Sequence, residues 1–112
     1  MCLTPEDEDW DRHDVQSSDY RTSFSIGEKA SFVIKQNADR KKSDDEVRIT
    51  YIIREKDGGP ISLTSETKVW NEMWNKRYCE LDIPKMPGVV GEYTIEIYFN
   101  GSLTTSQNFS II

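Results

Sequence analysis

The sequence predicts an all-β domain: a single antiparallel two-sheet β-sandwich of about seven strands, preceded by an acidic N-terminal tail. Three observations support this fold class. Apolar and polar residues alternate over several short stretches, turn-forming residues separate these stretches about every ten residues, and no long stretch carries a helical period. The 112 residues have room for one domain, and 12 aromatic side chains can supply its core.

The clearest element is a hairpin in the last third of the chain. Four apolar side chains recur at every second position and so share one face of a strand: Tyr93, Ile95, Ile97 and Phe99. Asn100-Gly101 follows directly, and this dipeptide tolerates the positive φ angles of a type I′ turn. The chain is therefore expected to reverse there into a second strand, from Leu103 to Ile111.

The earlier strands follow from the same alternation. Two short strands are expected within residues 22–35, separated by a turn at Gly27, and residues 37–46 form a polar loop. A strand at 47–55 has Ile52 on its otherwise polar face, which indicates a central strand covered on both sides. Gly58-Gly59-Pro60 then predicts a turn into a hairpin partner at 61–67.

Residues 68–84 carry two conflicting patterns. Several apolar side chains stand three or four positions apart, as on a helix: Val69, Trp70, Met73, Trp74 and Tyr78. Residues 77–83 alternate instead, as in a strand. A strand or turn is expected through 67–74 and a strand at 76–83, and a helix over 69–78 stays open as the alternative.

Charge divides the chain into two parts. Residues 1–20 carry seven acids and one base, which accounts for the whole net charge of −6, whereas residues 21–112 are balanced. We therefore expect an acidic tail at 1–20 and the folded domain at 21–112. The balanced domain offers no basic surface for a nucleic acid, and no stretch reaches the ~20 apolar residues of a transmembrane segment.

The chain has two cysteines, Cys2 and Cys79, which form either one disulfide or two thiols. A bridge between them is one candidate. The alternative is a small buried hydrophobe at Cys79 and a loose terminal residue at Cys2. Met1-Cys2 before a polar acidic stretch would also fit a bacterial lipoprotein, so Cys2 is a candidate lipid anchor.

The residues do not predict catalysis. The one histidine, His13, lies in the acidic tail, where Asp9, Asp11 and Asp14 could join it at a metal but little would hold them in place. A calcium loop would also need a glycine bend and a closing glutamate, which this stretch lacks. We expect a protein that is not an enzyme, with no catalytic residue, metal or cofactor.

One cluster stands out as a candidate binding site: Trp70, Trp74 and Tyr78. Exposed aromatic rings at this spacing could stack on a sugar or form the centre of a protein interface. The alternative is that these side chains fill the core of a small domain, although at least one of the two tryptophans is expected at the surface.

Two stretches, residues 81–101 and residues 24–32, resemble immunoglobulin-like, filamin-like and fibronectin-like sandwich modules. In such modules a proline and glycine corner leads to a tyrosine at the start of a late strand, as in Pro87-Gly88 followed by Tyr93. The strand that begins at Tyr93 has no cysteine, so the inter-sheet disulfide of antibody domains is not implied. The resemblance implies an immunoglobulin-like fold with a binding, spacing or assembly role.

Together these features predict a non-catalytic binding or structural module that mediates protein–protein interaction or spacing. Its partner is expected to be a protein or a polysaccharide. The alternative functions are a carbohydrate-binding module and an accessory domain of a larger secreted enzyme. The expected location is extracellular or at the cell surface, with the cytoplasm as the alternative.

Overall fold

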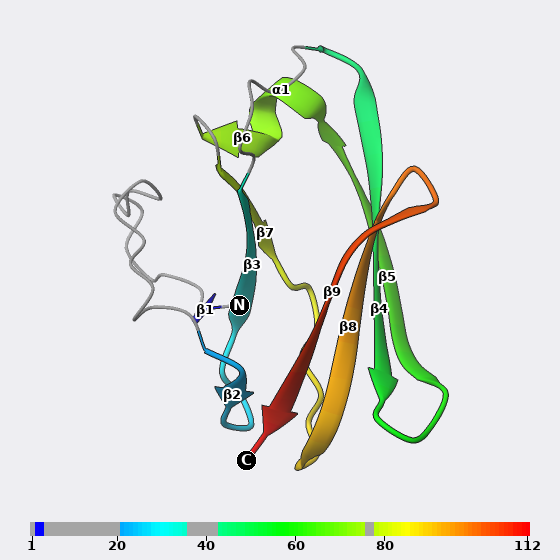
Figure 1. Ribbon diagram of the computed structural model, residues 1–112. Helices are drawn as coiled ribbons and strands as arrows, with labels where there is room; N and C mark the ends of the chain where they lie inside the picture. The colour runs from blue at the N-terminus through cyan, green and yellow to red at the C-terminus, as the bar shows by residue number, and fades with distance from the viewer. Residues whose placement is uncertain (1, 4–20, 36–42, 76–77) are drawn as a thin grey trace.

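The computed structural model describes residues 2–3, 21–35, 43–75 and 78–112. The protein is mostly β, with two sheets that face each other and one short helix (Figure 1). This confirms the predicted mostly-β class with two sheets. Apart from Cys2 and Leu3, the expected acidic tail lies outside the described residues, so the boundary at residue 20 stays a prediction.

The larger sheet has the strand order β2-β9-β8-β4-β5. Its members are β2 (Ser23–Phe24), β4 (Glu46–Glu55), β5 (Pro60–Val69), β8 (Gly91–Phe99) and β9 (Ser102–Ile111). The expectation of purely antiparallel sheets was wrong here, because β2 runs parallel to β9. The pairing joins residues far apart in the chain, which local alternation cannot reveal.

The smaller sheet has the order β1-β3-β7-β6 and is antiparallel throughout. Its members are β1 (Cys2–Leu3), β3 (Ala30–Lys35), β6 (Trp74–Asn75) and β7 (Tyr78–Asp82). The two short strands expected within residues 22–35 are therefore present as β2 and β3, but they belong to different sheets.

The predicted hairpin is confirmed as β8 and β9. Phe99 pairs with Ser102, and the turn residues between them have positive φ angles, 51° at Asn100 and 84° at Gly101. The Asn100 side chain also accepts a hydrogen bond of 2.9 Å from the backbone N–H of Arg48, which ties the turn to β4. One bulge interrupts the ladder, where the register shifts between Ile97 and Tyr98.

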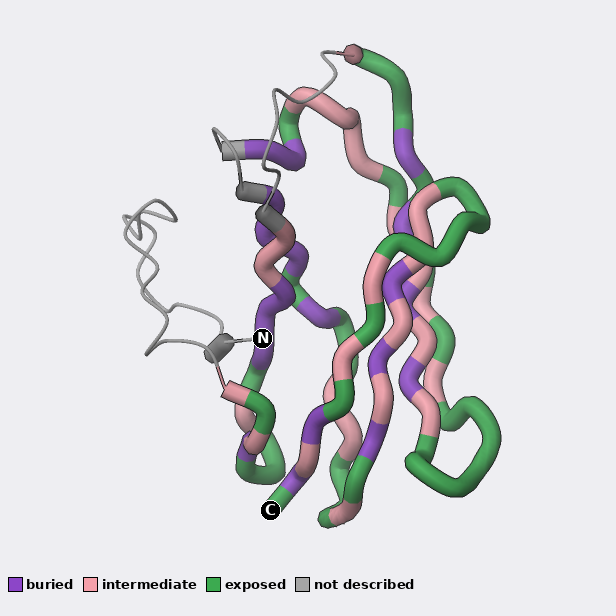
Figure 2. Tube along the Cα trace, viewed as in Figure 1, coloured by how far each residue is buried: buried purple, intermediate pink, exposed green. Residues whose placement is uncertain are grey.

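The core lies between the two sheets, where the buried positions alternate along the strands (Figure 2). On β4 the inward side chains Ile49, Tyr51 and Ile53 are almost fully buried. Ile52 faces the other way, is half-buried and lies opposite Leu63 of β5. As expected, β4 is a central strand, since it pairs with β5 on one side and with β8 on the other. The expected cover over both of its faces was wrong among the described residues, because Leu63 beside Ile52 is 65% exposed on the outer face.

The ambiguous segment contains a single helical turn, α1 (Trp70–Met73), between β5 and β6. The helix left open over 69–78 is thus real but short, and β7 accounts for the strand expected at 76–83. Backbone hydrogen bonds anchor the turn, from Trp70 N to Asp45 O at 2.9 Å and from Asn71 N to Ser43 O at 3.0 Å. These contacts come from a distant loop.

Candidate interaction surface

The two tryptophans of the predicted binding cluster pack within the protein. Trp74 is buried, with 8% of its surface exposed, and Trp70 is half-buried against the core. Their rings meet edge to face with centroids 5.4 Å apart, and Trp70 makes a second such contact with Phe99 at 6.1 Å. The Tyr78 side chain lies outside the described residues. A binding role for these three residues stays a prediction.

The cysteines of the candidate disulfide lie in the smaller sheet. Cys79 is fully buried on β7 and pairs with Ile34 of β3, whereas the backbone of Cys2 pairs with Ser31 on the other side of β3. The side chain of Cys2 is not among the parts of the chain that the structure describes. The bridge and the lipid anchor therefore both stay predictions.

A different surface stands out at one end of the molecule, which we call the loop end. The turn after β2, the β4–β5 turn, the β7–β8 connection and the C-terminus all lie there (Figure 1). The described ranges have seven exposed large apolar side chains. Four of them belong to these segments, and Ile61 lies next to the β4–β5 turn, as the second residue of β5; the four are Ile26, Val89, Val90 and Ile112. Val89 and Val90 are 68% and 61% exposed, so this end presents apolar side chains to solvent.

Hydrogen bonds fix the segments of the loop end to the strands. The Tyr93 hydroxyl donates to the carbonyl of Val89 at 2.6 Å, and this holds the β7–β8 connection against β8. The backbone N–H of Lys56 donates to Glu92 O at 3.1 Å, and that of Ile112 donates to Phe24 O at 2.9 Å. These hydrogen bonds thus fix the backbone of the segments that bear the exposed apolar side chains.

Two hollows open at the loop end and share one wall, formed by Met86, Pro87 and Gly88. One hollow, of about 600 Å³, reaches the turn that contains Ile26. The other, of about 230 Å³, reaches Ile61 and Val89. Apolar and charged side chains both line these hollows: Glu28, Lys29 and Asp82 in the first, and Glu55 and Lys85 in the second. Their concave apolar parts could receive an apolar side chain of a partner.

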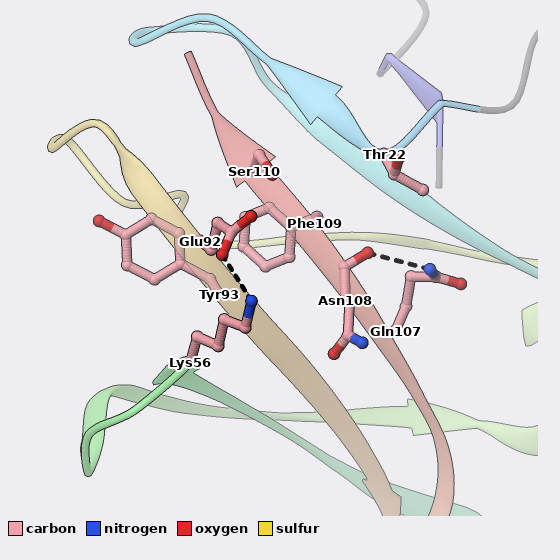
Figure 3. A pocket seen from close by; sticks show the side chains of 8 residues that line it. All are labelled: Thr22, Lys56, Glu92, Tyr93, Gln107, Asn108, Phe109 and Ser110. Atoms are coloured by element: carbon pink, nitrogen blue, oxygen red, sulfur yellow. Dashed lines mark hydrogen bonds and ion pairs between the residues drawn. The ribbon is translucent and has the colours of Figure 1, made fainter.

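Two ion pairs lie near this end. Lys56 Nζ lies 2.9 Å from Glu92 Oε2, and this hydrogen bond raises the pKa of Lys56 above its usual value. Arg21 Nη2 lies 3.4 Å from Glu28 Oε1. The Lys56–Glu92 pair borders a third hollow of about 340 Å³ beside β9 (Figure 3). The loop end therefore combines exposed apolar side chains with charged residues of both signs.

The described residues contain no group of three histidine, cysteine, aspartate or glutamate side chains that could hold a metal ion. His13 and its neighbouring aspartates lie outside those residues, so the expectation at that position stays a prediction. Within the same ranges, no helix is long and apolar enough to cross a membrane, since α1 has four residues.

Sequence reasoning missed the loop end, although a signal was present. Val89 and Val90 stand between Gly88 and Gly91 in a connection rich in turn residues, where β-branched apolar side chains have no core to fill. Adjacent apolar residues inside a predicted turn could have marked this surface. Comparison of the chain with protein-family models, with curated proteins and with solved structures found no match.

Proposed function

We propose that the chain is an immunoglobulin-like β-sandwich that acts as a non-catalytic binding module and holds a protein partner at its loop end. The strand order supports the fold. If β3 to β9 are lettered B, C, C′, D, E, F and G, and β1 and β2 form two halves of strand A, the sheets read A-B-E-D and A-G-F-C-C′. Immunoglobulin-like domains group strands A, B, E and D against G, F and C, and variable types add C′.

A second feature supports the same fold. Immunoglobulin-like sandwiches carry a tyrosine near the start of strand F whose hydroxyl bonds to the backbone a few residues upstream. Tyr93 stands near the start of β8, and its hydroxyl bonds to the carbonyl of Val89, four positions earlier. Tyr93 therefore matches the tyrosine of such sandwiches both in residue type and in the position of its hydrogen bond.

The observation that carries the proposed function is the concentration of exposed apolar side chains at the loop end. Soluble proteins seldom expose neighbouring large apolar side chains without a binding role, because each gives up the free energy of burial. An apolar centre within a polar border is the usual anatomy of a protein–protein interface. We therefore assign the loop end to a protein partner that contributes apolar side chains to the two hollows.

Site-specific photo-crosslinking tests this assignment. A photoreactive phenylalanine analogue is placed at Val90 or at Ile61, both at the loop end. The control position is Leu103, which is 56% exposed and follows the β8–β9 turn at the opposite end of the sheet. In cells that express the chain, both loop-end positions are expected to capture the same protein, and position 103 is expected to capture none of it.

The affinity of the captured protein is then measured for the unmodified chain and for two variants. The double variant Val89→Ser/Val90→Ser should weaken its binding by about tenfold or more, because two apolar contacts are lost, whereas Leu103→Ser should leave affinity unchanged. Equal capture from position 103, or no capture from either loop-end position, would contradict the proposal. The proposal would also be contradicted if a polysaccharide binds the unmodified chain and no longer binds the double variant.

A further inference from the structure

The outer face of the larger sheet carries apolar side chains that none of the described elements covers. Residues opposite each other on neighbouring strands point to the same face, so Ile52 of β4 shares this face with Leu63 of β5. Tyr98 of β8 and Leu103 of β9 lie opposite each other on the same face. Leu63 and Leu103 are 65% and 56% exposed, and Ile52 and Tyr98 are half-buried. Because the smaller sheet lies against the inner face (Figure 1), these four side chains have no cover within the described ranges.

Several polar side chains of the outer face are already hydrogen-bonded within the chain. Thr50 Oγ1 lies 3.0 Å from Ser65 Oγ, and Thr94 Oγ1 donates to Asn108 Oδ1 at 2.8 Å. A polar group that keeps its hydrogen bond costs less free energy to bury than one that loses water without replacement. Burial of this face therefore requires few hydrogen bonds from a partner, and a flat surface of apolar and paired polar side chains suffices.

Two opposite charges lie side by side near the middle of the outer face. Arg54 Nε donates to Glu96 Oε1 at 2.6 Å, and their side chains are 38% and 20% exposed. Arg54 belongs to β4 and Glu96 to β8, the two middle strands of the group β5-β4-β8-β9. A two-fold axis that runs along the strands between β4 and β8 places Arg54 of one copy against β8 of the other, next to its Glu96. The outer face is therefore complementary to itself in charge.

The size of the outer face also fits a second copy. Its four strands have nine or ten residues each, so the face is about 30 Å long and about 19 Å wide. Two such faces together have roughly 1,100 Å² of projected area, close to the ~1,200 Å² at which specific interfaces begin. A second copy covers the whole face, because it has the same dimensions and packed sheets keep their strand directions within about 30° of each other.

We propose that the outer face pairs with the outer face of a second copy of the chain, sheet against sheet, about a two-fold axis between β4 and β8. The contact buries the apolar cluster of Ile52, Leu63, Tyr98 and Leu103 in both copies. It also supplies the cover that Ile52 indicated for the otherwise polar side of its strand. Both loop ends then point the same way and stay outside the contact.

The contact lies at the lower limit of interface size, so the dimer is expected to be weak. We expect a dissociation constant of roughly 1 to 100 µM. Sedimentation equilibrium over increasing concentration measures it directly. The average mass should rise from 13.0 kDa toward twice that value and stop there, because a two-fold contact closes on itself.

Leu63→Lys tests the apolar cluster, and Val90→Lys at the loop end is the matched control, since the two side chains are 65% and 61% exposed. Leu63→Lys should weaken self-association by about tenfold or more, because an apolar contact is lost from each copy and a charge takes its place. Val90→Lys should associate as the unmodified chain does. The protein captured at the loop end should respond in the opposite way and lose affinity for Val90→Lys alone, so the two proposals fail or succeed separately.

Charge reversal tests the pairing of Arg54 with Glu96 across the axis. Arg54→Glu alone brings four carboxylates together in the dimer, and Glu96→Arg alone brings four guanidinium groups together, so each variant should self-associate about tenfold more weakly or worse. An equimolar mixture of the two variants should associate again, because one copy is then acidic and the other basic at this point. The double variant Arg54→Glu/Glu96→Arg restores the pair within each copy and should associate as the unmodified chain does.

Circular dichroism checks that every variant is folded. A mass that stays at 13.0 kDa up to millimolar concentration would overturn the proposal, as would a mass that grows beyond the dimer. Equal weakening by Leu63→Lys and Val90→Lys, or a mixture of the two charge variants that stays monomeric, would show that the copies do not meet through the outer face.

Discussion

The hydroxyl of Tyr93 lies 2.6 Å from the carbonyl oxygen of Val89, four positions earlier, and joins the start of β8 to the connection before it. The tyrosine ring is buried and stacks on Phe109 of β9, with centroids 5.6 Å apart. One residue therefore joins the β7–β8 connection to the central hairpin. This contact holds Val89 and Val90 in the exposed position on which the proposed function depends.

Tyr93→Phe should keep the stacked ring and remove only this hydrogen bond. We expect the free energy of unfolding to fall by about 1 kcal/mol, measured by urea denaturation. Amide exchange should accelerate in residues 84–90, since their anchor is lost. The control is Val89→Ala, which keeps the carbonyl and changes an exposed side chain, so it should cost less than about 0.5 kcal/mol. Equal effects of the two substitutions would show that the hydrogen bond adds no stability.

The ionisation of Tyr51 is expected to make the domain less stable at alkaline pH. Burial and the 2.5 Å hydrogen bond to Glu66 Oε1 raise the pKa of Tyr51 above its ordinary value. The unfolded chain releases this proton near pH ~10, whereas the folded chain retains it, so the contribution to stability is full below that pH and falls as pH rises. The slope should approach about 1.4 kcal/mol per pH unit.

Urea unfolding of Tyr51→Phe between about pH 8 and pH 11 measures this contribution, because the variant has no phenol at that position to titrate. The variant should be less stable near neutral pH, where the hydrogen bond is missing, and should lose less stability above pH ~10. Tyr98→Phe, on the outer face of β8, serves as control and should follow the unmodified chain. Parallel curves for Tyr51→Phe and the unmodified chain would contradict the assignment.

Trp74 combines good packing with an unmet polar group. Its ring is buried against Trp70, but its indole N–H has no hydrogen-bond partner in the structure as described. Trp74→Ala should cost about 3–5 kcal/mol because it leaves a cavity. Trp74→Phe should cost much less, within about 1 kcal/mol. It keeps an aromatic ring, and it removes a buried N–H that destabilises the fold by about 1–3 kcal/mol when it has no partner. Thermal unfolding of both variants decides this, and similar losses would indicate a partner for the N–H.

The elements that were predicted correctly from the sequence are those determined by neighbouring residues. Alternation from Tyr93 to Phe99 and the Asn100-Gly101 turn are properties of a few neighbouring residues, and both are present in the structure. The strands at 47–55 and 61–67 were placed within a few residues for the same reason. The ends of β5 differ because its pairing with β4 continues to Val69.

The features that were missed depend on distant contacts. Parallel pairing of β2 with β9 joins Ser23 to Ser110, and no local pattern encodes it. The single turn of α1 is held by Ser43 and Asp45 from another loop. The candidate surface was missed because exposure, unlike alternation, depends on which segments meet at one end of the fold.

The β8–β9 turn allows a prediction from backbone conformation alone. Gly101 has a φ angle of 84°, and a Cβ atom built there meets no atom within 4 Å. Gly101→Ala should therefore cost about 1–2 kcal/mol through strain in the left-handed region. Gly59, in the β4–β5 turn, has equal space but no positive φ angle, so Gly59→Ala should be neutral or stabilising by up to about 1 kcal/mol. Urea denaturation of this pair separates conformation from packing, and an equal loss in both variants would refute the type I′ turn as the source of hairpin stability.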